Sequence, residues 1–350
     1  MPVLTWNLTV ADVVAETADA VTIVFDPLAS ECLYLPGQFL TLRVPSERTG
    51  FVARCYSLSS SPSTDDHLAV TVKRTADGYA SNWLCDNVSV GDQIQCLPPN
   101  GVFTPTKVDG DLLLLAAGSG ITPMLSIAKS ALAGPGGRIV LVYANRDAES
   151  VIFAAALRDL VDEHPDRITV IHWLEAVQGL PRQATLAALL EPFHAFDVFI
   201  CGPTPFMKAA RHALEGFGTP RARIHIENFV SLSGDPFTEP DISDAAAVDV
   251  TTNDPANDAE ARCVVTVTLD GQRYELPRSP TRTLIDLLIE NAIDAPYSCR
   301  EGDCGTCQCV LVSGRVDMDS HGALDEEDIA DGIVLGCQAR PASDTVEIEF

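Results

Sequence analysis

The feature that most constrains this chain is a set of four cysteines near its C-terminal end. Three follow one another with the spacing C-x4-C-x2-C, and the fourth lies thirty residues further on. They are Cys299, Cys304, Cys307 and Cys337. Three thiolates in one short loop and a fourth from elsewhere suit an iron–sulfur cluster, because such thiolates surround the iron atoms from one side and close the cage from the other. Gly302 and Gly305 allow the loop to curl closely around inorganic sulfide.

Two other interpretations of these cysteines fit less well. Structural zinc sites use paired C-x2-4-C knuckles, and here the second half offers Cys337 alone. A disulfide framework would require export, which nothing in the chain suggests. The spacing resembles that of plant-type 2Fe-2S ferredoxins. Cys309 stands outside the pattern, and we expect it to pack as an ordinary buried thiol.

Length and composition indicate two or three globular domains, because the chain has 350 residues, 46% hydrophobic and 21% charged. A formal net charge of -26 argues against nucleic acid and membrane lipid as partners and favours a basic partner. The longest apolar run, residues 112–117, is too short to span a bilayer. The start shows no signal-peptide pattern and the eleven cysteines are irregularly spaced, so we expect a cytoplasmic protein.

Residues 3–106 predict an antiparallel β-barrel, because short strands alternate with frequent turn signals. Within it, Arg54, Tyr56 and Ser57 place a guanidinium, an aromatic ring and a hydroxyl at alternating positions. These groups can neutralise a pyrophosphate, stack on a flat heterocycle and bond to its ring nitrogen, although an ordinary barrel strand also explains them. A candidate phosphate seat follows, ahead of a predicted helix. It comprises Lys73, Gly78 and Ser81.

Residues 111–226 alternate strand and helix, which predicts a parallel α/β sheet with a ligand at the carboxyl ends of its strands. The first strand, 111–117, runs into a glycine turn that allows close approach to a phosphate, and a helix over 124–132 follows. The turn contains Gly118, Gly120, Thr122 and Pro123, with proline where the full G-x-G-x-x-G motif has glycine. Two later strands end in further candidate ligand-binding residues. These are Arg146 and Asp147, and then Cys201, Gly202 and Pro203.

The C-terminal third begins with an acidic linker and continues with a hairpin over 264–276, a helix over 284–291 and the cysteine loop. We therefore expect four segments. They are a flavin-binding barrel at 1–106, a nucleotide-binding α/β domain at 107–232, the acidic linker at 233–261 and a β-grasp 2Fe-2S ferredoxin domain at 262–350.

These motifs together resemble the ferredoxin-NADP reductase superfamily, in particular the reductase components of bacterial multicomponent oxygenases, which carry a C-terminal plant-type ferredoxin domain. The resemblance covers nearly the whole chain. It implies that Arg54, Tyr56 and Ser57 bind the flavin, that the Gly118 turn binds the dinucleotide and that Cys201 lies beside the nicotinamide. It further implies that Glu227 and Phe229 lie near the flavin.

Three segments, 36–43, 71–86 and 113–124, resemble the reductases of 3-ketosteroid 9α-hydroxylase systems. This likeness implies a Rieske-type steroid oxygenase as partner. The reductases of phenylacetyl-CoA epoxidases are similar in layout, so they stay an alternative.

The resemblance implies an electron relay, in which NAD(P)H gives two electrons to the flavin and the cluster accepts them singly. FAD is favoured over FMN because the seat at Gly78 and Ser81 extends far enough for a dinucleotide. NADH is favoured, with NADPH possible, because Arg146 suits a 2′-phosphate but Asp147 repels one. A non-enzymatic electron carrier is a further alternative. The chain lacks a Rieske C-x-H…C-x2-H pattern, so we do not expect it to oxygenate a substrate itself.

Overall fold

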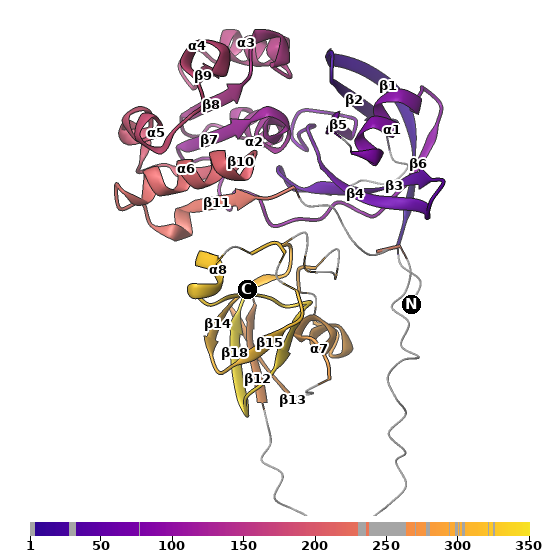
Figure 1. Cartoon of the computed structure of the whole chain (residues 1–350), viewed down its shortest axis with the longest axis vertical. Helices are drawn as coiled ribbons and strands as arrows, with labels where there is room; N and C mark the ends of the chain where they lie inside the picture. Colours follow the sequence, from indigo (N-terminus) through magenta and orange to yellow (C-terminus); the bar gives the residue numbers. More distant parts are fainter. Residues whose placement is uncertain are drawn as a thin grey trace, which may run out of the picture. The chain divides into compact units, whose positions relative to one another are not determined.

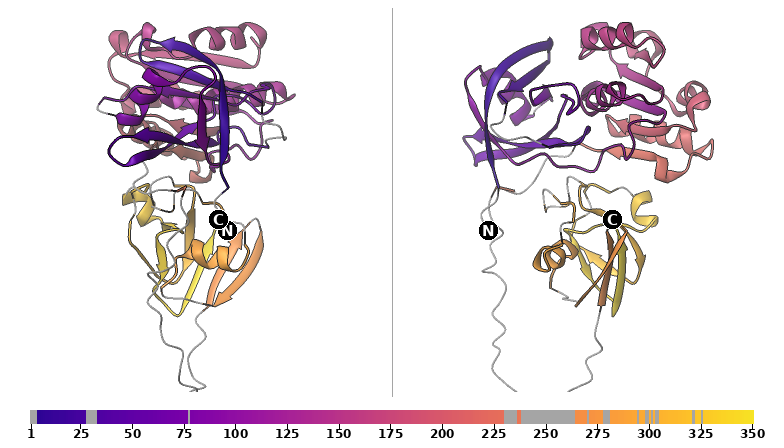
Figure 2. Two further views of the ribbon diagram at one scale, coloured as in Figure 1. Left: turned by 90° about the vertical axis from the view of Figure 1, so that its right-hand side faces the viewer. Right: turned by 180° about the vertical axis from the view of Figure 1, so that it is seen from behind.

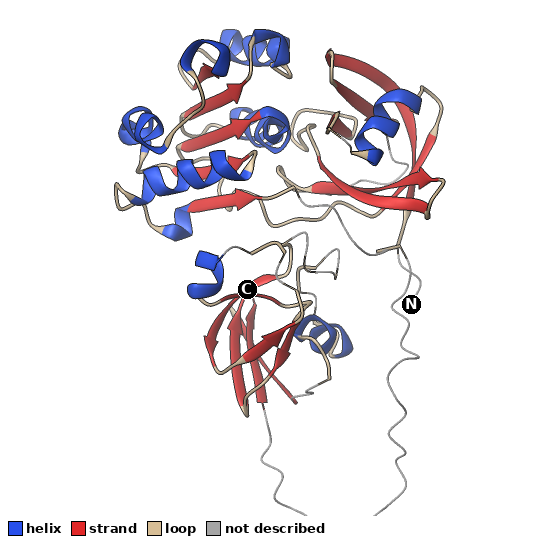
Figure 3. Ribbon diagram, viewed as in Figure 1, coloured by secondary structure: helices blue, strands red, loops and turns tan. Residues whose placement is uncertain are grey.

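The computed structural model describes residues 4–27, 33–76, 78–229, 236–237, 264–269, 271–277, 281–293, 295–297, 300, 302, 305–320, 322–324 and 326–350. The chain divides into two compact units, of which the larger is Thr5–Phe229 and the smaller contains the described C-terminal residues. Figure 1 labels the elements and Figure 3 separates helices from strands.

The first half of the larger unit is an antiparallel sheet with strand order β4-β3-β6-β1-β2-β5. Its strands are β1 (Trp6–Thr17), β2 (Ala20–Phe25), β3 (Phe39–Ser46), β4 (Gly50–Ser57), β5 (Ala69–Lys73) and β6 (Gln93–Cys96), with helix α1 (Tyr79–Asn87) after β5. The two outer strands of this order also meet, because Leu58 bridges to Val70 just after β4. This contact closes the sheet into the predicted barrel, which Figure 2 shows from two further sides.

The barrel core forms because alternate side chains along each strand point to the inside of the barrel. Leu40, Leu42 and Val44 on β3 are fully buried, together with Ile23 and Phe25 on β2. Leu84 of α1 packs into the same cluster, which places this helix beside the strands.

The second half of the larger unit is a parallel sheet with strand order β11-β10-β7-β8-β9. The strands are β7 (Leu112–Ala117), β8 (Ile139–Asn145), β9 (Ile168–Leu174), β10 (Asp197–Cys201) and β11 (Ile224–Glu227). The helices are α2 (Ile121–Ala133), α3 (Ala154–Glu163), α4 (Glu175–Gln178), α5 (Gln183–Leu190) and α6 (Thr204–Glu215), with short 3-10 turns η1 (Gly118–Gly120), η2 (Ala148–Ser150), η3 (Glu191–Phe193) and η4 (Arg221–Arg223).

Helices cover both faces of this sheet, which explains why β7 is apolar throughout (Figure 3). Leu112 and Leu114 share a core cluster with α2 and α3, whereas Leu113 and Leu115 share one with α5 and α6. The predicted α/β sheet is therefore confirmed. The helix expected at 124–132 begins earlier, at Ile121, because proline is well accommodated in a first helical turn.

The smaller unit contains a mixed sheet with strand order β13-β12-β18-β14-β16 and a separate pair, β15-β17. Its elements are β12 (Val264–Leu269), β13 (Gln272–Pro277), α7 (Leu284–Glu290), β14 (Gln308–Ser313), β15 (Val316–Met318), α8 (Glu326–Ala330), β16 (Ile333–Leu335), β17 (Ala339–Pro341) and β18 (Thr345–Glu349). The first hairpin, β12-β13, is antiparallel, and β12 pairs with the last strand, β18, in parallel.

Helix α7 packs its apolar side against this sheet. Leu284 and Leu288 share a core cluster with Val265 and Val267 of β12 and Ile348 of β18. A helix held against a mixed sheet with a parallel central pair is the β-grasp arrangement that we predicted. The acidic linker at 233–261 lies outside the described residues, apart from 236–237. None of the helices in the described ranges is long and apolar enough to cross a membrane.

Candidate functional site

The two halves of the larger unit meet through a hydrogen bond between Ser57, the last residue of β4, and Glu227, the last residue of β11. The Ser57 hydroxyl donates to Oε2 of Glu227 at 3.1 Å. β11 pairs with β10 so that Glu227 lies opposite Cys201. Three residues singled out in the sequence, from motifs up to 170 positions apart, therefore come together at one point.

Both titratable groups at this point favour their neutral forms. Withdrawal from water raises the pKa of Glu227 to about 8, and the hydrogen bond from Ser57 opposes that rise. Burial, and then the neighbouring Glu227 carboxylate, raise the pKa of the Cys201 thiol well above its usual value. The site therefore presents a protonated carboxyl and a protonated thiol at neutral pH.

Arg54 and Tyr56 project from one face of β4, and Ser57 lies on the other face, because successive side chains alternate along a strand. The prediction placed all three groups at alternating positions, but the structure separates the hydroxyl from the other two. Tyr56 packs against the barrel core and is half-buried. Burial raises the pKa of Tyr56, although the Arg54 guanidinium acts in the opposite sense, so its phenol stays protonated.

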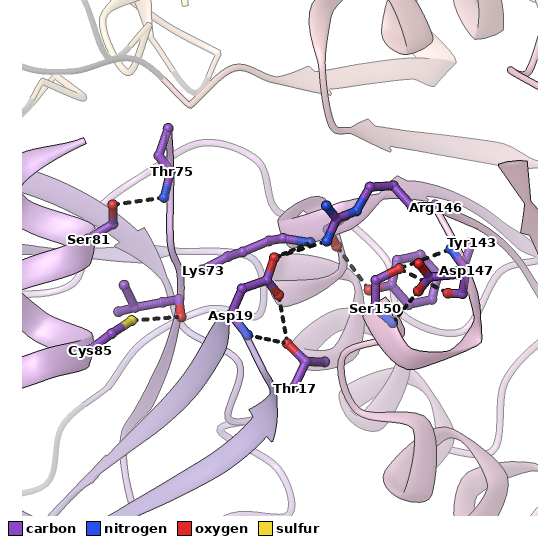
Figure 4. A network of polar contacts seen from close by, with 12 residues as sticks. Thr17, Asp19, Lys73, Thr75, Ser81, Cys85, Tyr143, Arg146, Asp147 and Ser150 are labelled. Carbon is purple, nitrogen blue, oxygen red and sulfur yellow. Dashed lines mark hydrogen bonds and ion pairs between the residues drawn. The ribbon is translucent and has the colours of Figure 1, made fainter. Parts of the chain in front are cut away.

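The predicted phosphate seat lies at the start of α1. Gly78 precedes the helix, and no side chain caps the first turn of α1. Ser81 accepts a hydrogen bond from the amide of Thr75 at 3.1 Å, so its hydroxyl fixes the loop that connects β5 to the helix (Figure 4). Nearby, Lys73 ends β5 with its side chain 20% exposed. Backbone N–H groups at an uncapped helix start, with a lysine near them, fit an anionic phosphate.

The glycine turn after β7 is shaped by close backbone approach. A Cβ atom at Gly120 would collide with the carbonyl group of Cys201, and one at Gly202 would lie 2.8 Å from Cβ of Ala117. The Thr122 hydroxyl donates to the carbonyl of Ser119 at 3.1 Å, which fixes the start of α2. Pro203 immediately precedes the first residue of α6. The two turns at the carboxyl ends of β7 and β10 thus touch each other, as expected for a nucleotide-binding edge.

The end of β8 adds a signal that fits a bound ligand. Asn145 is buried, and neither polar atom of its side chain has a hydrogen-bond partner among the residues that the structure describes. The hydroxyl of Tyr143, two residues earlier, donates to the carbonyl of Gly118 at 3.0 Å. Native proteins rarely leave buried polar groups unsatisfied, so a ligand atom fits beside Asn145. Asp147 caps η2, because its carboxylate accepts a hydrogen bond from the amide of Ser150 at 2.9 Å.

Arg146 forms an ion pair, although 68% of its side chain is exposed to solvent. Its guanidinium lies 3.2 Å from Oδ2 of Asp19, a residue of the barrel (Figure 4). Sequence reasoning missed Asp19, because its only local signature is a hairpin turn. It also missed Asn145, although a polar residue at the end of a buried strand was a usable signal.

Phe229 lies just beyond β11 and exposes 47% of its surface.

Polar contacts also hold the two halves of the larger unit together, and one of them is fully buried. The Ser126 hydroxyl donates to the carbonyl of Ser60 at 2.6 Å, and Lys129 binds Asp65 at 2.7 Å. These contacts tie α2, which follows the glycine turn, to the barrel.

The described cysteines of the C-terminal motif are Cys307 and Cys337, and both are buried. The amide of Gly336 donates to the carbonyl of Cys307 at 2.8 Å, which brings the third and fourth cysteine segments together. Cys299 and Cys304 lie outside the described residues. Burial raises the pKa of Cys309 to about 12, and its thiol packs in the core as expected.

Gln338 connects the two cysteine segments. Its amide nitrogen donates to the carbonyl of Arg300 at 2.8 Å and lies 3.8 Å from Sγ of Cys337. Gly302 and Gly305 have positive φ angles of 80° and 73°, which glycine adopts readily. Thiols, permissive glycines and a nearby amide donor fit an iron–sulfur cluster.

Three family models match successive parts of the chain. A model described as "Oxidoreductase FAD-binding domain" matches residues 7–104, and one described as "Oxidoreductase NAD-binding domain" matches residues 114–212. A third, "2Fe-2S iron-sulfur cluster binding domain", matches residues 267–342. The expected cofactor classes, FAD, NAD and a 2Fe-2S cluster, are thereby confirmed.

Relatives match the chain over nearly its full length. The chain is 55% identical to the ferredoxin reductase component of 3-ketosteroid-9-alpha-monooxygenase from Rhodococcus rhodochrous, covering 98% of this chain and 96% of that protein. It is 33% identical to a component of 1,2-phenylacetyl-CoA epoxidase from Escherichia coli strain K12, over 98% and 97% of the two chains. The structure of phthalate dioxygenase reductase has the same fold, with a TM-score of 0.57 at 24% identity over 99% and 98% of the chains.

Full-length similarity and three consecutive domain matches agree with the fold and with the residues that meet at the site. The chain is therefore an oxidoreductase that belongs to the ferredoxin-NADP reductase superfamily, in the branch whose members join an FAD-binding domain, an NAD-binding domain and a C-terminal 2Fe-2S domain.

Proposed function

We propose that this chain is the reductase component of a 3-ketosteroid 9α-monooxygenase. It takes electrons from NADH and delivers them, through FAD and a 2Fe-2S cluster, to a Rieske-type terminal oxygenase in steroid degradation. The partner assignment is supported by 55% identity to a reductase of that name, compared with 33% to the phenylacetyl-CoA epoxidase component. A reductase of the latter kind is the alternative.

The proposal that electrons pass from NADH to the flavin rests on the hydrogen bond between Ser57 and Glu227, with Cys201 beside them. This hydrogen bond joins the end of the strand that bears Arg54 and Tyr56 to the carboxyl edge of the parallel sheet. When bound, a flavin accepts electrons in pairs from the nicotinamide and passes them on singly. That exchange requires the two rings to be close together, and the residues where the two halves of the larger unit meet would hold them there.

The barrel residues of this proposal hold the flavin. Tyr56 contributes a neutral aromatic face, Arg54 a cation for the pyrophosphate, and Ser57 a hydroxyl that Glu227 orients. The phosphate end is assigned to Lys73, Gly78 and Ser81. Phe229 lies close to Glu227 in the chain and covers the flavin side of the site in this proposal.

The nucleotide is assigned to the carboxyl edge of the parallel sheet. The backbone of the two glycine turns approaches the pyrophosphate, and Cys201 and Glu227 form the wall of the nicotinamide pocket. The full set comprises Gly118, Gly120, Thr122, Pro123, Arg146, Asp147, Cys201, Gly202 and Pro203. Neutral Cys201 and Glu227 side chains keep negative charge away from the electron donor.

The iron ligands in this proposal are Cys299, Cys304, Cys307 and Cys337. Domain boundaries at 1–106, 107–232, 233–261 and 262–350 form part of the same proposal, supported by family matches that begin and end inside them.

The first test is anaerobic titration of the purified protein with NADH and, separately, NADPH, followed by visible absorbance and EPR. Bleaching of the flavin by NADH together with a rhombic 2Fe-2S signal is expected. Bleaching without that signal would leave a flavin reductase, and absence of bleaching with either nucleotide would leave a passive carrier. The partner is tested by reconstitution, in which the protein should support a purified 3-ketosteroid 9α-oxygenase and not the phenylacetyl-CoA epoxidase oxygenase.

A further inference from the structure

A carboxylate of the barrel reaches the edge of the proposed nucleotide site. Asp19 lies in the two-residue turn between β1 and β2, where Thr17 pairs with Ala20. The Thr17 hydroxyl donates to Oδ1 of Asp19 at 2.8 Å, so the carboxylate is oriented by its own hairpin. Its second oxygen, Oδ2, points away from the turn and toward the α/β half of the unit (Figure 4).

Two cations from different elements converge on this oxygen. Nζ of Lys73 lies 3.8 Å from Oδ2 of Asp19, and a guanidinium nitrogen of Arg146 lies 3.2 Å from it (Figure 4). Lys73 also faces the glycine turn, since a Cβ at Gly118 would lie 3.9 Å from its Nζ. Asp19 therefore lies between a lysine that faces the glycine turn and an arginine at the end of β8.

The position of Arg146 is that of a residue which reads the adenosine ribose. In doubly wound sheets the ribose 2′ group is recognised by a side chain that follows the second strand, and β8 is the second strand here. The neighbouring Asn145 is buried, and both polar atoms of its side chain lack a hydrogen-bond partner among the described residues, which fits a ligand at this place. Asp147 caps η2 and lies close enough to Arg146 to be influenced by its charge, whereas Asp19 forms the ion pair with the Arg146 guanidinium.

We propose that Asp19 is a specificity-determining residue for the dinucleotide, and that it acts across the boundary between the barrel and the α/β half. It balances the charge of Arg146 and places a fixed negative charge beside it. A 2′-phosphate, which carries between one and two negative charges at neutral pH, must then compete with Asp19 for the guanidinium. A 2′-hydroxyl is uncharged, so it does not compete with Asp19 for the guanidinium in this way. This inference rests on the proposed nucleotide function of the site and identifies a residue outside the nucleotide-binding motifs.

The test uses the full-length protein with its cofactors and two adenosine probes, 2′,5′-ADP and 5′-AMP, whose dissociation constants are measured by calorimetry. Asp19→Asn should bind 2′,5′-ADP about two- to fivefold more tightly, the range of a solvent-exposed ion pair. Its affinity for 5′-AMP should change much less. In Asp19→Asn combined with Arg146→Gln the gain should disappear, because it requires the freed guanidinium.

Asp12→Asn is the matched control, since it removes one negative charge from the same hairpin, where Oδ1 of Asp12 accepts a hydrogen bond from the amide of Val13. Flavin absorbance and the melting temperature report whether each variant is folded. An equal gain for both probes, or a gain that persists in the double variant, would overturn the role of Asp19. If the wild type bound neither probe, the nucleotide site itself would be refuted, and the role of Asp19 with it.

Discussion

The pKa of Glu227 leads to a pH dependence that can be calculated and tested. Because withdrawal from water raises this pKa to about 8, the carboxyl is neutral at pH 7 and becomes negative as the pH rises through 8. A negative charge beside the flavin opposes electron uptake, so the rate of flavin bleaching by NADH should fall over that range. In Glu227→Gln the fall should be absent.

Ser57→Ala provides the quantitative part of this prediction. The Ser57 hydroxyl donates to Oε2 of Glu227 at 3.1 Å and thereby stabilises the charged form. A hydrogen bond to a charged group contributes about 1.5 kcal/mol at the lower end of its range. We take that end because the residue as a whole keeps part of its surface exposed, although its carboxyl is withdrawn from water. Loss of this hydrogen bond should therefore raise the pKa of Glu227 further, by about one unit.

The assay is anaerobic stopped-flow absorbance of the flavin with saturating NADH, from about pH 6.5 to pH 10, which reports pKa values in the complex. The wild-type midpoint is expected near 8 and the Ser57→Ala midpoint near 9. Buffers of matched ionic strength exclude a general salt effect. A profile that is the same in Glu227→Gln as in the wild type would show that another group titrates, and the reasoning from burial would fail.

Three further predictions concern other parts of the molecule. Gly120→Ala should abolish NAD⁺ binding and destabilise the larger unit by about 1–3 kcal/mol, because a Cβ there collides with the Cys201 carbonyl. Calorimetry and melting curves should show neither effect for Gly134→Ala, where the nearest contact of an added Cβ is 3.7 Å away. Gln338→Leu should lower the reduction potential of the cluster, because hydrogen bonds to the sulfurs tune that potential, and an unchanged EPR-monitored redox titration would exclude the role of its amide. With a net charge of -26, reduction of a basic partner should slow as ionic strength rises, and a flat series of rates would rule out electrostatic steering.

Much of the fold follows from local patterns in the sequence. The unbroken apolar run of β7 required a strand buried on both faces, and the structure places helices on each side of it. The Gly118 turn lies between strand and helix as predicted, because glycine and proline limit the backbone conformations open to such a turn. The spacing of the four cysteines was by itself enough to indicate an iron–sulfur domain, since cluster geometry restricts which spacings can bind it.

The tertiary structure decided how these segments work together. Ser57 and Glu227 are 170 residues apart, and Asp19 and Arg146 are 127 apart, so no local pattern indicates that either pair meets. These contacts depend on how the barrel docks against the parallel sheet and on the register that sets Glu227 opposite Cys201. The same docking determines which charges are balanced and which carboxyl is withdrawn from water. Sequence determines the chemistry that each segment carries, but the pKa of Glu227 and the pairing of Arg146 arise only from neighbours that folding brings together.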